Sequence, residues 1–424
     1  MKNRKLAILG GEPVVPKLST YQSIGARETD AVKKVLESQC ISGFYGSPGP
    51  EFLGGPQIQS FEASWAERFE VRHAVSVNSN TSGLIAAMAA IGLGPGDEVI
   101  LPAWSMSATA MAPLFYGGIP VFADIDGETF CIDFEHVKSQ ITSRTRAIIA
   151  VNLFGHPARL ADLKALADQH GLYLIEDNAQ APLGSENGKL CGTVGHIGVF
   201  SLNYHKHIHT GEGGMCVTND DDLALRLQLV RNHGENLVTA EGIDDISNLI
   251  GMNLRMTEMS AAIGLVQLDQ IDQHVSRREQ IATRLSDGTA DLLGWQPPKV
   301  REHCRHNYYC WVVKYSAEEV GVPLTDFSRA LTAEGFPNFT RYLPPLYMLP
   351  VFQKRQAIGR NGFPFSLSDI EYSPGLCPVT ESLHDDGVLL FEPCAWEISS
   401  KICDSLVEAV RKVYNQREAL PRTS

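Results

Sequence analysis

The sequence predicts an α/β protein built around a large, mostly parallel β-sheet. Seven short apolar segments occur between residues 73 and 218, and helix-like or turn-rich segments separate them. This alternation is typical of parallel strands joined by helical crossovers. The composition is that of a globular protein, because 44% of the 424 residues are hydrophobic and 20% are charged. Ligands in such sheets bind outside the carboxyl ends of the strands, so we expect the chemistry there.

The predicted strands and helices follow from local patterns. The strand at 73–78 leads into Ser79-Asn80-Thr81, which are favourable N-cap residues for the Ala-rich helix that follows through residue 91. A second helix is expected at 160–170, where Gly171 ends it. The other six predicted strands are 98–102, 120–123, 147–153, 172–175, 197–201 and 215–218.

The pattern changes after about residue 275, where charged helical segments alternate with a β-prone run. The sequence therefore predicts a large domain at 1–275, which includes an N-terminal arm, and a smaller α+β domain at 276–424. The elements expected in the smaller domain are helices at 276–286, 323–335 and 397–417, and a strand in the run 307–315.

Charge and cysteine usage narrow the function classes. The formal net charge is −13, and Lys and Arg form no cluster, so nucleic acid is not an expected partner. The nine cysteines are odd in number and scattered, which indicates a reducing compartment and no disulfide framework. The apolar run 6–9 is too short for a signal peptide, and no stretch approaches the ~20 apolar residues that span a bilayer. We expect a cytoplasmic protein without membrane association.

A lysine and a glycine-rich turn follow the strand at 197–201. Lys206 lies five residues after Ser201, and Gly211-Glu212-Gly213-Gly214 comes next. Glycines allow a ligand to approach the backbone closely. A lysine in this setting is a phosphate-binding cation, a Schiff-base amine or an ordinary solvated side chain.

Two other segments place polar groups at strand ends. Asp177 follows the apolar strand at 172–175, either as a functional carboxylate at the sheet edge or as the cap of a turn. The segment 79–83 opens a helix, and free backbone N–H groups with the helix dipole make such an end an anion site.

Metal binding is not expected. A site built from His205, His207 and His209 would compete with the chemistry of the neighbouring Lys206. The His and Cys residues of the segment 303–310 have a spacing that matches no usual zinc pattern.

Together and in this order, the segments resemble the DegT-type sugar aminotransferases, a branch of the fold-type-I enzymes that use pyridoxal 5′-phosphate (PLP). The resemblance runs from about residue 24 to the C-terminus. It implies a large seven-stranded sheet domain and a smaller C-terminal α+β domain. The motifs that carry it are Asn80-Thr81-Ser82, Glu176-Asp177-Asn178-Ala179-Gln180, Phe200-Ser201 with Lys206 and the glycine turn, and Gly251-Met252-Asn253-Leu254-Arg255-Met256-Thr257-Glu258.

The resemblance implies a role for each matching residue. Lys206 would hold PLP as a Schiff base and move a proton during transamination, and Asp177 would pair with the pyridinium nitrogen. Gln180 would pack beside the ring. Asn253 would reach the phosphate from the neighbouring subunit, which implies a homodimer with shared active sites. The phosphate would otherwise be held by Thr81, Ser82 and Ser201.

Two positions depart from the family pattern. Asn80 stands where the family usually has Gly, so the phosphate turn is expected to differ in shape. The position that usually stacks an aromatic ring on PLP is Met106, while Trp104 lies two residues earlier. Either the Met106 thioether covers the ring or Trp104 does, and the register favours Met106.

The expected substrate contacts come from variable loops. The candidates are Trp104, His205, His207, Arg341 and Tyr342. The segment 43–56, rich in Gly and Pro, is either a loop that walls the site or an irregular connection.

The expected activity is transfer of an amino group from glutamate or glutamine to a keto-sugar, preferably a nucleotide-linked one. A keto-cyclitol is an alternative acceptor. A PLP-dependent sugar dehydratase is a second alternative, because some relatives carry His in the position of Lys206. A PLP-binding regulator without catalytic activity is a third, and the presence of both Lys206 and Asp177 argues against it.

Overall fold

The computed structural model describes residues 5–421 and contains the predicted sheet. Its strand order is β1-β9-β8-β5-β4-β2-β3. β2, β3, β4, β5 and β8 run parallel, whereas β9 is antiparallel to both of its neighbours. The expectation of a mostly parallel seven-stranded sheet is confirmed. Its strands are β1 (His73–Val77), β2 (Glu98–Pro102), β3 (Ile119–Ala123), β4 (Thr145–Val151), β5 (Tyr173–Asp177), β8 (Ile197–Ser201) and β9 (Gly214–Thr218).

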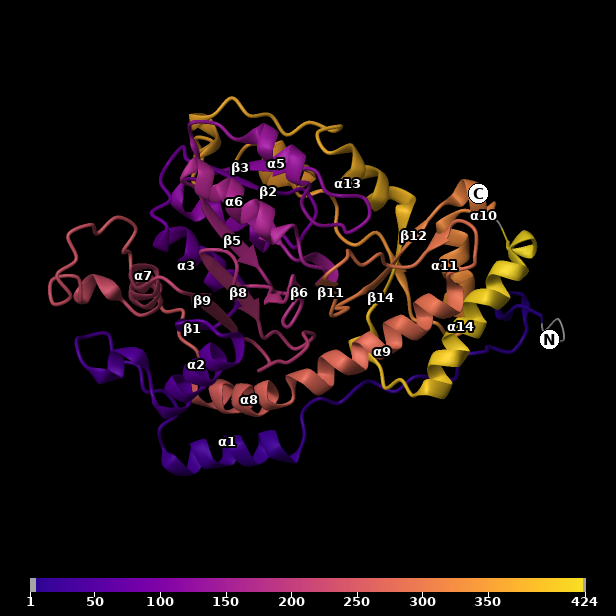
Figure 1. Ribbon diagram of the computed structural model, residues 1–424, viewed down its shortest axis with the longest axis horizontal. Helices are drawn as coiled ribbons and strands as arrows, with labels where there is room; N and C mark the ends of the chain where they lie inside the picture. The colour runs from indigo at the N-terminus through magenta and orange to yellow at the C-terminus, as the bar shows by residue number, and fades with distance from the viewer. Residues whose placement is uncertain (1–4, 422–424) are drawn as a thin grey trace.

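Helices cover both faces of this sheet (Figure 1). Alternate residues of a strand point to opposite faces, as the period of two requires. Ile149 of β4 therefore packs in the layer of α3 and α7, while Ile148 and Ala150 pack in the layer of α5 and α6. The covering helices are α2 (Pro56–Phe69), α3 (Asn80–Ala90), α5 (Phe134–Gln140), α6 (Leu160–His170), α7 (Asp221–Arg231) and α8 (Glu258–Asp269), and the short α4 (Ala108–Met111) follows β2.

The small domain packs its own four-stranded sheet against helices. The strand order is β10-β12-β14-β13, and the core holds Trp295, Trp311, Phe327 and Phe336. Its elements are α9 (Ile271–Thr289), β10 (Trp295–Gln296), β12 (Trp311–Tyr315), α10 (Ala317–Val320), α11 (Leu324–Ala333), β13 (Phe339–Thr340), β14 (Val388–Phe391) and α14 (Ser400–Asn415). The short helices α12 (Pro350–Gln353) and α13 (Pro378–Ser382) lie in the segment between β13 and β14.

The chain crosses between the two domains more often than a division at residue 275 implies. That residue lies inside α9, whose Val275 packs under the large sheet and whose Ile281 packs in the small domain. Residues Leu6 and Val15 belong to the small-domain core. Phe352, with the segment that follows, returns to the large domain and packs on Phe122 of β3. The apolar surface that each core must bury, not chain order, sets these crossings.

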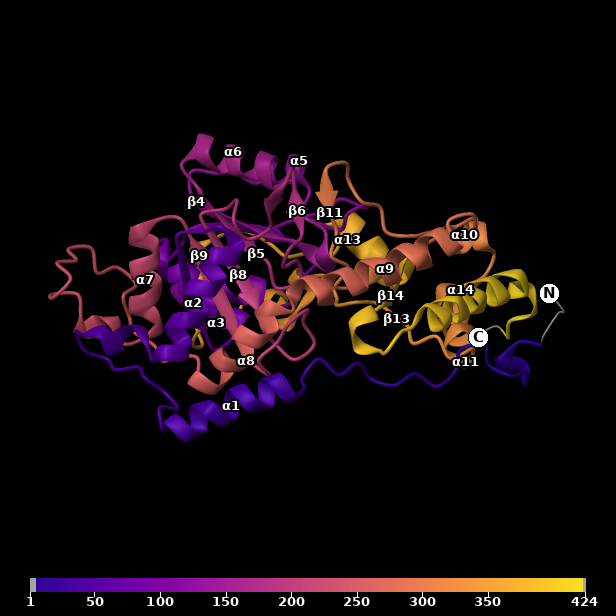
Figure 2. The ribbon, with the colours of Figure 1, turned by 60° about the horizontal axis from the view of Figure 1, so that its bottom comes forward.

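Two further features position the site. A small sheet of β11 (Cys304–Arg305), β6 (Ser185–Glu186) and β7 (Lys189–Leu190) ties the small domain to the loop after β5. The N-terminal arm runs from the small domain to α1 (Ala26–Ser38), which packs on α8 at the edge of the molecule (Figures 1 and 2).

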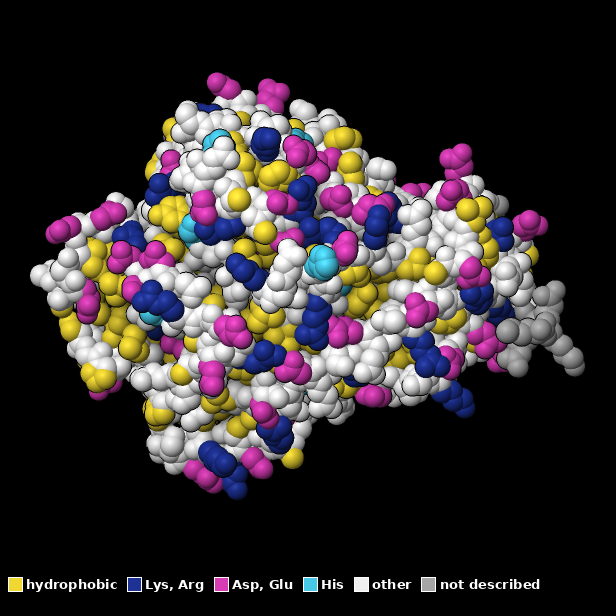
Figure 3. Space-filling view, in the orientation of Figure 1, with side chains coloured by type: hydrophobic (Ala, Val, Ile, Leu, Met, Phe, Trp, Pro, Cys, Tyr) yellow, Lys and Arg dark blue, Asp and Glu magenta, His cyan; other side chains and the backbone are white. Residues whose placement is uncertain are grey.

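The surface carries both signs of charge. On the face drawn in Figure 3, Lys and Arg side chains alternate with Asp and Glu. None of the helices within residues 5–421 combines the length and apolar character needed to cross a membrane.

Candidate active site

A cavity of about 410 Å³ lies at the carboxyl ends of β5 and β8. It is bordered by the start of α3, the loop after β2, the loop after β8 and residues of the small domain. This is the location that the sheet type predicts for a ligand. The predicted site residues that line it are Thr81, Met106, Asp177, Gln180, Ser201, His205, Lys206 and Tyr342.

Lys206 projects into this cavity from the loop after β8. Burial lowers the pKa of its amine, because the charged form loses hydration, and the negative charge of Asp177 opposes that effect. The amine nitrogen lies 4.4 Å from the centre of the Tyr309 ring. A partly buried lysine with a lowered pKa is suited to act as a nucleophile and proton carrier.

Asp177 ends β5 and faces the same cavity. Its carboxylate accepts hydrogen bonds from Thr109 Oγ1 at 2.8 Å, from Asn80 Nδ2 at 3.3 Å and from the backbone N–H of Ala179 at 3.3 Å. Burial raises the pKa of this carboxyl, and the hydrogen bond from Thr109 acts in the opposite direction. Among the described residues, no cationic side chain forms an ion pair with this carboxylate. A buried carboxylate of this kind is suited to bind a protonated ring nitrogen.

The start of α3, where the sequence predicts an anion site, borders the cavity. Ser79 is the N-cap, and its side chain accepts a hydrogen bond from the backbone N–H of Ser82 at 3.1 Å. Ser79, Asn80 and Thr81 line the cavity. The Ser82 hydroxyl instead donates to Asn78 Oδ1 at 2.6 Å, so it holds the turn and does not border the cavity.

Gln180 and Tyr342 form one hydrogen-bonded unit across the two domains. Gln180 Oε1 accepts from the backbone N–H of Phe154 at 2.7 Å, and its Nε2 donates to the Tyr342 hydroxyl at 3.0 Å. Because both ends of the amide are satisfied, its orientation is fixed.

The two candidates for covering the ring lie in different environments. Met106 lines the cavity and is 52% exposed. Trp104 is fully buried, donates from Nε1 to the backbone oxygen of Leu343 at 2.7 Å and packs against Tyr342. Trp104 therefore supports Tyr342 from behind and does not line the cavity.

The remaining predicted residues lie outside the cavity. His207 is buried and its Nε2 lies 3.3 Å from the backbone oxygen of Asn307. Arg341 is exposed, and its Nε donates to the backbone oxygen of Asp385 at 3.3 Å. Asn253 is exposed, and its Oδ1 accepts from Arg255 Nε at 2.8 Å. The segment 43–56 contributes no residue to the cavity of its own chain.

Sequence reasoning assigned no role to four residues that matter here. Thr109 binds Asp177, Tyr309 lies under the Lys206 amine, and Glu212 and Glu392 place carboxylates on the cavity wall. Tyr309 belongs to a β-prone run that indicated only packing, and the motif signal around Lys206 does not extend to residues a hundred positions away.

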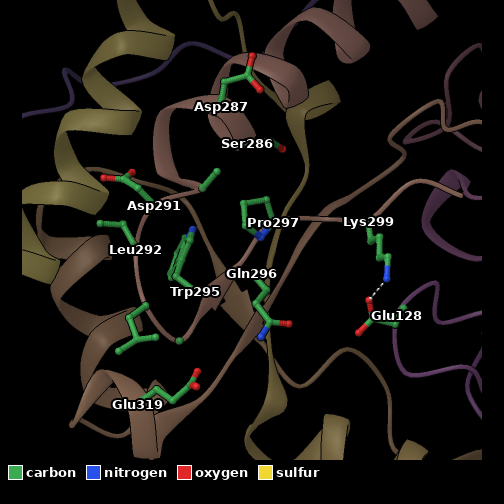
Figure 4. A pocket seen from close by; sticks show the side chains of 13 residues that line it. Glu128, Ser286, Asp287, Asp291, Leu292, Trp295, Gln296, Pro297, Lys299 and Glu319 are labelled. Carbon is green, nitrogen blue, oxygen red and sulfur yellow. Dashed lines mark ion pairs between the residues drawn. The ribbon is translucent and has the colours of Figure 1, made fainter. Parts of the chain in front are cut away.

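A separate hollow in the small domain has a different character (Figure 4). The side chains of Asp287, Asp291 and Glu319 surround it, and its lysine, Lys299, is paired with Glu128 at 2.9 Å. None of the predicted site residues lines this hollow. Within residues 5–421, no group of three or more His, Cys, Asp or Glu is arranged to hold a metal ion.

Comparisons with known proteins agree with this geometry. The model of the DegT/DnrJ/EryC1/StrS aminotransferase family matches residues 22–389. The chain belongs to this family. It is 34% identical to the L-glutamine:2-deoxy-scyllo-inosose aminotransferase of Streptomyces kanamyceticus, over 85% of this chain and 86% of the relative.

Two further matches cover much of the chain. GDP-perosamine synthase of Caulobacter vibrioides is 39% identical over 71% of this chain and 78% of its own length. The crystal structure of an aminotransferase from Psychrobacter cryohalolentis superimposes with a TM-score of 0.81 at 27% identity, over 94% of this chain and 99% of that one. The protein is a PLP-dependent aminotransferase of the DegT family.

The cavity has the groups that PLP requires. Lys206 offers a buried amine, Asp177 a buried carboxylate, and the start of α3 an anion site. These three groups come from separate segments of the chain and border one space, so the residues fit the cofactor.

Proposed function

We propose that this aminotransferase moves an amino group from glutamine or glutamate onto the ring ketone of an uncharged polyol, of the keto-cyclitol or keto-sugar type. The observation that carries the proposal is the charge of the cavity wall. Besides Asp177, which is assigned to the cofactor, its titratable side chains include the carboxylates of Glu212 and Glu392, while Lys206 is its one basic residue other than His205, among the residues described. A wall of this kind offers hydrogen-bond acceptors to hydroxyl groups and repels a diphosphate.

Several residues of the site have a proposed part in the reaction. PLP, when bound, accepts the amino group from the donor and passes it to the acceptor ketone. Lys206, with its lowered pKa, takes up and returns protons at its amine nitrogen. Asp177 would keep the ring nitrogen of the cofactor protonated. The Thr109 hydroxyl donates a hydrogen bond to the Asp177 carboxylate at 2.8 Å and holds it in place. The hydrogen bond between Gln180 and Tyr342 at 3.0 Å fixes the orientation of these two side chains on the cavity wall.

A nucleotide-linked keto-sugar is the second candidate. It is the acceptor that the sequence resemblance favours, and the synthase from Caulobacter vibrioides carries a nucleotide in its name. A nucleotide would extend out of the cavity, whose volume is about 410 Å³, and its phosphates would need cations from elsewhere, such as a second subunit.

The second subunit also has a proposed role at the phosphate. Asn253 lies outside the cavity of its own chain and is exposed. The proposal is a homodimer in which Asn253 of one copy completes the phosphate site of the other.

The test presents both acceptor classes to the purified protein loaded with PLP and glutamine. The expected result is amination of 2-deoxy-scyllo-inosose, detected as the amine by mass spectrometry, with little turnover of a nucleotide-linked 4-keto-sugar. Lys206→Ala should abolish the reaction, and Lys189→Ala, which removes an exposed lysine elsewhere, should not.

Three other outcomes would contradict the proposal in different ways. Amination of the nucleotide-linked sugar alone would establish the second candidate. Loss of a hydroxyl without amination would indicate a dehydratase. A cofactor absorbance that is unchanged by every amino donor would indicate a regulator.

A further inference from the structure

A second cavity of about 550 Å³ adjoins the cofactor cavity. The two share His205, Lys206 and Glu392 on their walls, so a molecule that reacts at Lys206 can extend into either space. The other wall of the second cavity is the N-terminal arm, residues 20–24, together with Arg278 of α9.

The arm is held in place across this cavity by specific hydrogen bonds. The backbone N–H of Tyr21 donates to the backbone oxygen of Ala395 at 3.0 Å, and the Tyr21 hydroxyl lies 3.1 Å from His274 Nδ1. The Ser23 hydroxyl lies 2.7 Å from His209 Nε2. The cavity is therefore a built compartment and not a gap beside a loose terminus.

Arg278 brings an unsatisfied donor to this compartment. The residue is 4% exposed, and its Nη2 donates to the backbone oxygen of Lys206 at 3.1 Å. Its Nη1 is buried and has no hydrogen-bond partner within the described part of the chain. Leaving a buried guanidinium N–H unpaired is costly, so this atom indicates a ligand acceptor.

Glu392 brings an acceptor to the same compartment. It follows β14, is partly buried, and no hydrogen bond or ion pair within residues 5–421 reaches its carboxylate. Burial raises its pKa, and the positive charges of Lys206 and Arg278 act in the opposite direction. Arg278 and Glu392 both line this cavity, and no ion pair within 4.0 Å joins them among the described residues.

The neighbouring histidines do not alter this balance at neutral pH. Burial lowers the pKa of His205 to about 4, and burial also places the pKa of His207 well below its usual range. Burial also lowers the pKa of His209, the third histidine on this wall. Apart from Lys206, which the compartment shares with the cofactor cavity, its charged side chains are then one guanidinium and one carboxylate. That combination is complementary to a neutral group with a donor and an acceptor, and a carboxylate ligand would meet the like charge of Glu392.

We infer that this compartment binds the side-chain carboxamide of a glutamine donor, with its oxygen accepting from Arg278 Nη1 and its NH₂ donating to Glu392. The inference rests on the proposed function, since it assigns the donor side of the same reaction. It makes Glu392 the residue that distinguishes glutamine from glutamate. A primary carboxamide offers both partners that the two side chains lack, whereas the γ-carboxylate of glutamate offers only one.

The experiment follows the donor half of the reaction alone, so that the acceptor plays no part. Protein loaded with PLP is mixed with glutamine or with glutamate, and the change in cofactor absorbance is followed over time. For each donor this gives the maximal rate of the half-reaction and the apparent dissociation constant, and the ratio of the two is compared between donors. The wild-type protein should favour glutamine by roughly tenfold or more, because a hydrogen bond to a charged group is lost with glutamate. Glu392→Gln should reduce that preference by a similar factor, mainly through a gain with glutamate. Glu397→Gln, which changes an exposed carboxyl near the arm, should leave the preference unchanged.

Arg278→Lys provides an independent readout. It should weaken the apparent affinity for glutamine more than the affinity for alanine, an amino donor without a side-chain amide. Equal effects on the two donors would show that Arg278 only supports the Lys206 loop and would overturn the assignment. A wild-type preference for glutamate, or an unchanged preference in Glu392→Gln, would also overturn it. An absorbance that no donor changes would instead refute the proposed transamination.

Discussion

The electrostatic environment of Asp177 determines how the buried site can hold a protonated ring. Its carboxylate receives three hydrogen bonds from Thr109, Asn80 and the backbone of Ala179, and burial alone would favour its neutral form. The donors therefore offset the cost of keeping a charge in an apolar setting.

The Asp177→Asn variant tests that role. An amide cannot stabilise the facing cation, so the rate of amino transfer should fall by roughly 10²–10³-fold, as happens when one preorganised electrostatic partner is removed. The Lys206-linked cofactor absorbance should persist, because Lys206 is intact. Thr109→Val, which removes only the 2.8 Å hydrogen bond to this carboxylate, should cause a smaller loss. A variant Asp177→Asn with full activity would contradict the assignment.

Sequence reasoning identifies residues whose signal is local. Lys206 and Asp177 each follow a strand and lie in a compact motif, and the structure brings both to one cavity. Tyr309 and Glu392 come from the small domain, and only the packing of that domain on the sheet brings them to Lys206. Trp104 shows the converse, because an aromatic side chain near the motif turns into the core.

At the scale of elements, α3 connects the sheet to the proposed phosphate site. Its Gly83 lies against β8 and β9, where an added Cβ would be 2.6 Å from Val199 Cγ1 and 3.0 Å from Cys216 Sγ. The helix can therefore approach the sheet closely only with glycine at this position. The approach places Ser79, Asn80 and Thr81 on the cavity wall.

The Gly83→Ala variant should move the start of α3 away from the cavity. Overpacking of this kind costs about 1–3 kcal/mol of unfolding free energy, and the affinity for PLP should fall with it. Urea unfolding and cofactor titration measure the two effects. Val199→Ala combined with Gly83→Ala should restore part of both, because it removes the clashing methyl groups. Gly25→Ala is the control, since its Cβ would meet only Glu28 Oε2 at 3.8 Å. If the double variant is no better than Gly83→Ala, the clash is not the cause.

The elements that could be predicted are those with strong periodicity or caps. All seven strands of the large sheet were found, as was α6, which Gly171 ends in the left-handed conformation. The two-residue strands β6, β7 and β11 carry no periodic signal, because so few residues cannot show an alternation. The return of Phe352 to the large domain depends on a pocket beside Phe122, which local patterns cannot reveal.

At the scale of the whole molecule, Asn253 is exposed and lies outside the cavity of its own chain. Two large aromatic side chains are also exposed: Tyr204, on the wall of the second cavity, is 70% exposed, and Tyr45, in the segment 43–56, is 68% exposed. Large exposed aromatic side chains are typical of an interface. These features support the proposed homodimer, in which one copy covers the site of the other.

Mixed dimers test this arrangement directly. Lys206→Ala removes the reacting amine, and Asn253→Ala should weaken cofactor binding enough to abolish activity at limiting PLP. If Asn253 acts across the interface, a mixed dimer of the two variants contains one site with both residues intact. Refolding an equimolar mixture should then restore activity to roughly a quarter of the wild-type sites, since half of the dimers are mixed and half of their sites are complete.

The control mixture combines Lys206→Ala with the double variant Lys206→Ala, Asn253→Ala, which contains no intact amine and should stay inactive. The specific activity of the first mixture should also fall on dilution, because the mixed dimers dissociate into monomers. If Asn253 served the site of its own chain, no pairing of the two single variants would hold both residues in one site, and the mixture would show no recovery. Recovery in the first mixture but not in the control therefore assigns Asn253 to the neighbouring subunit's site.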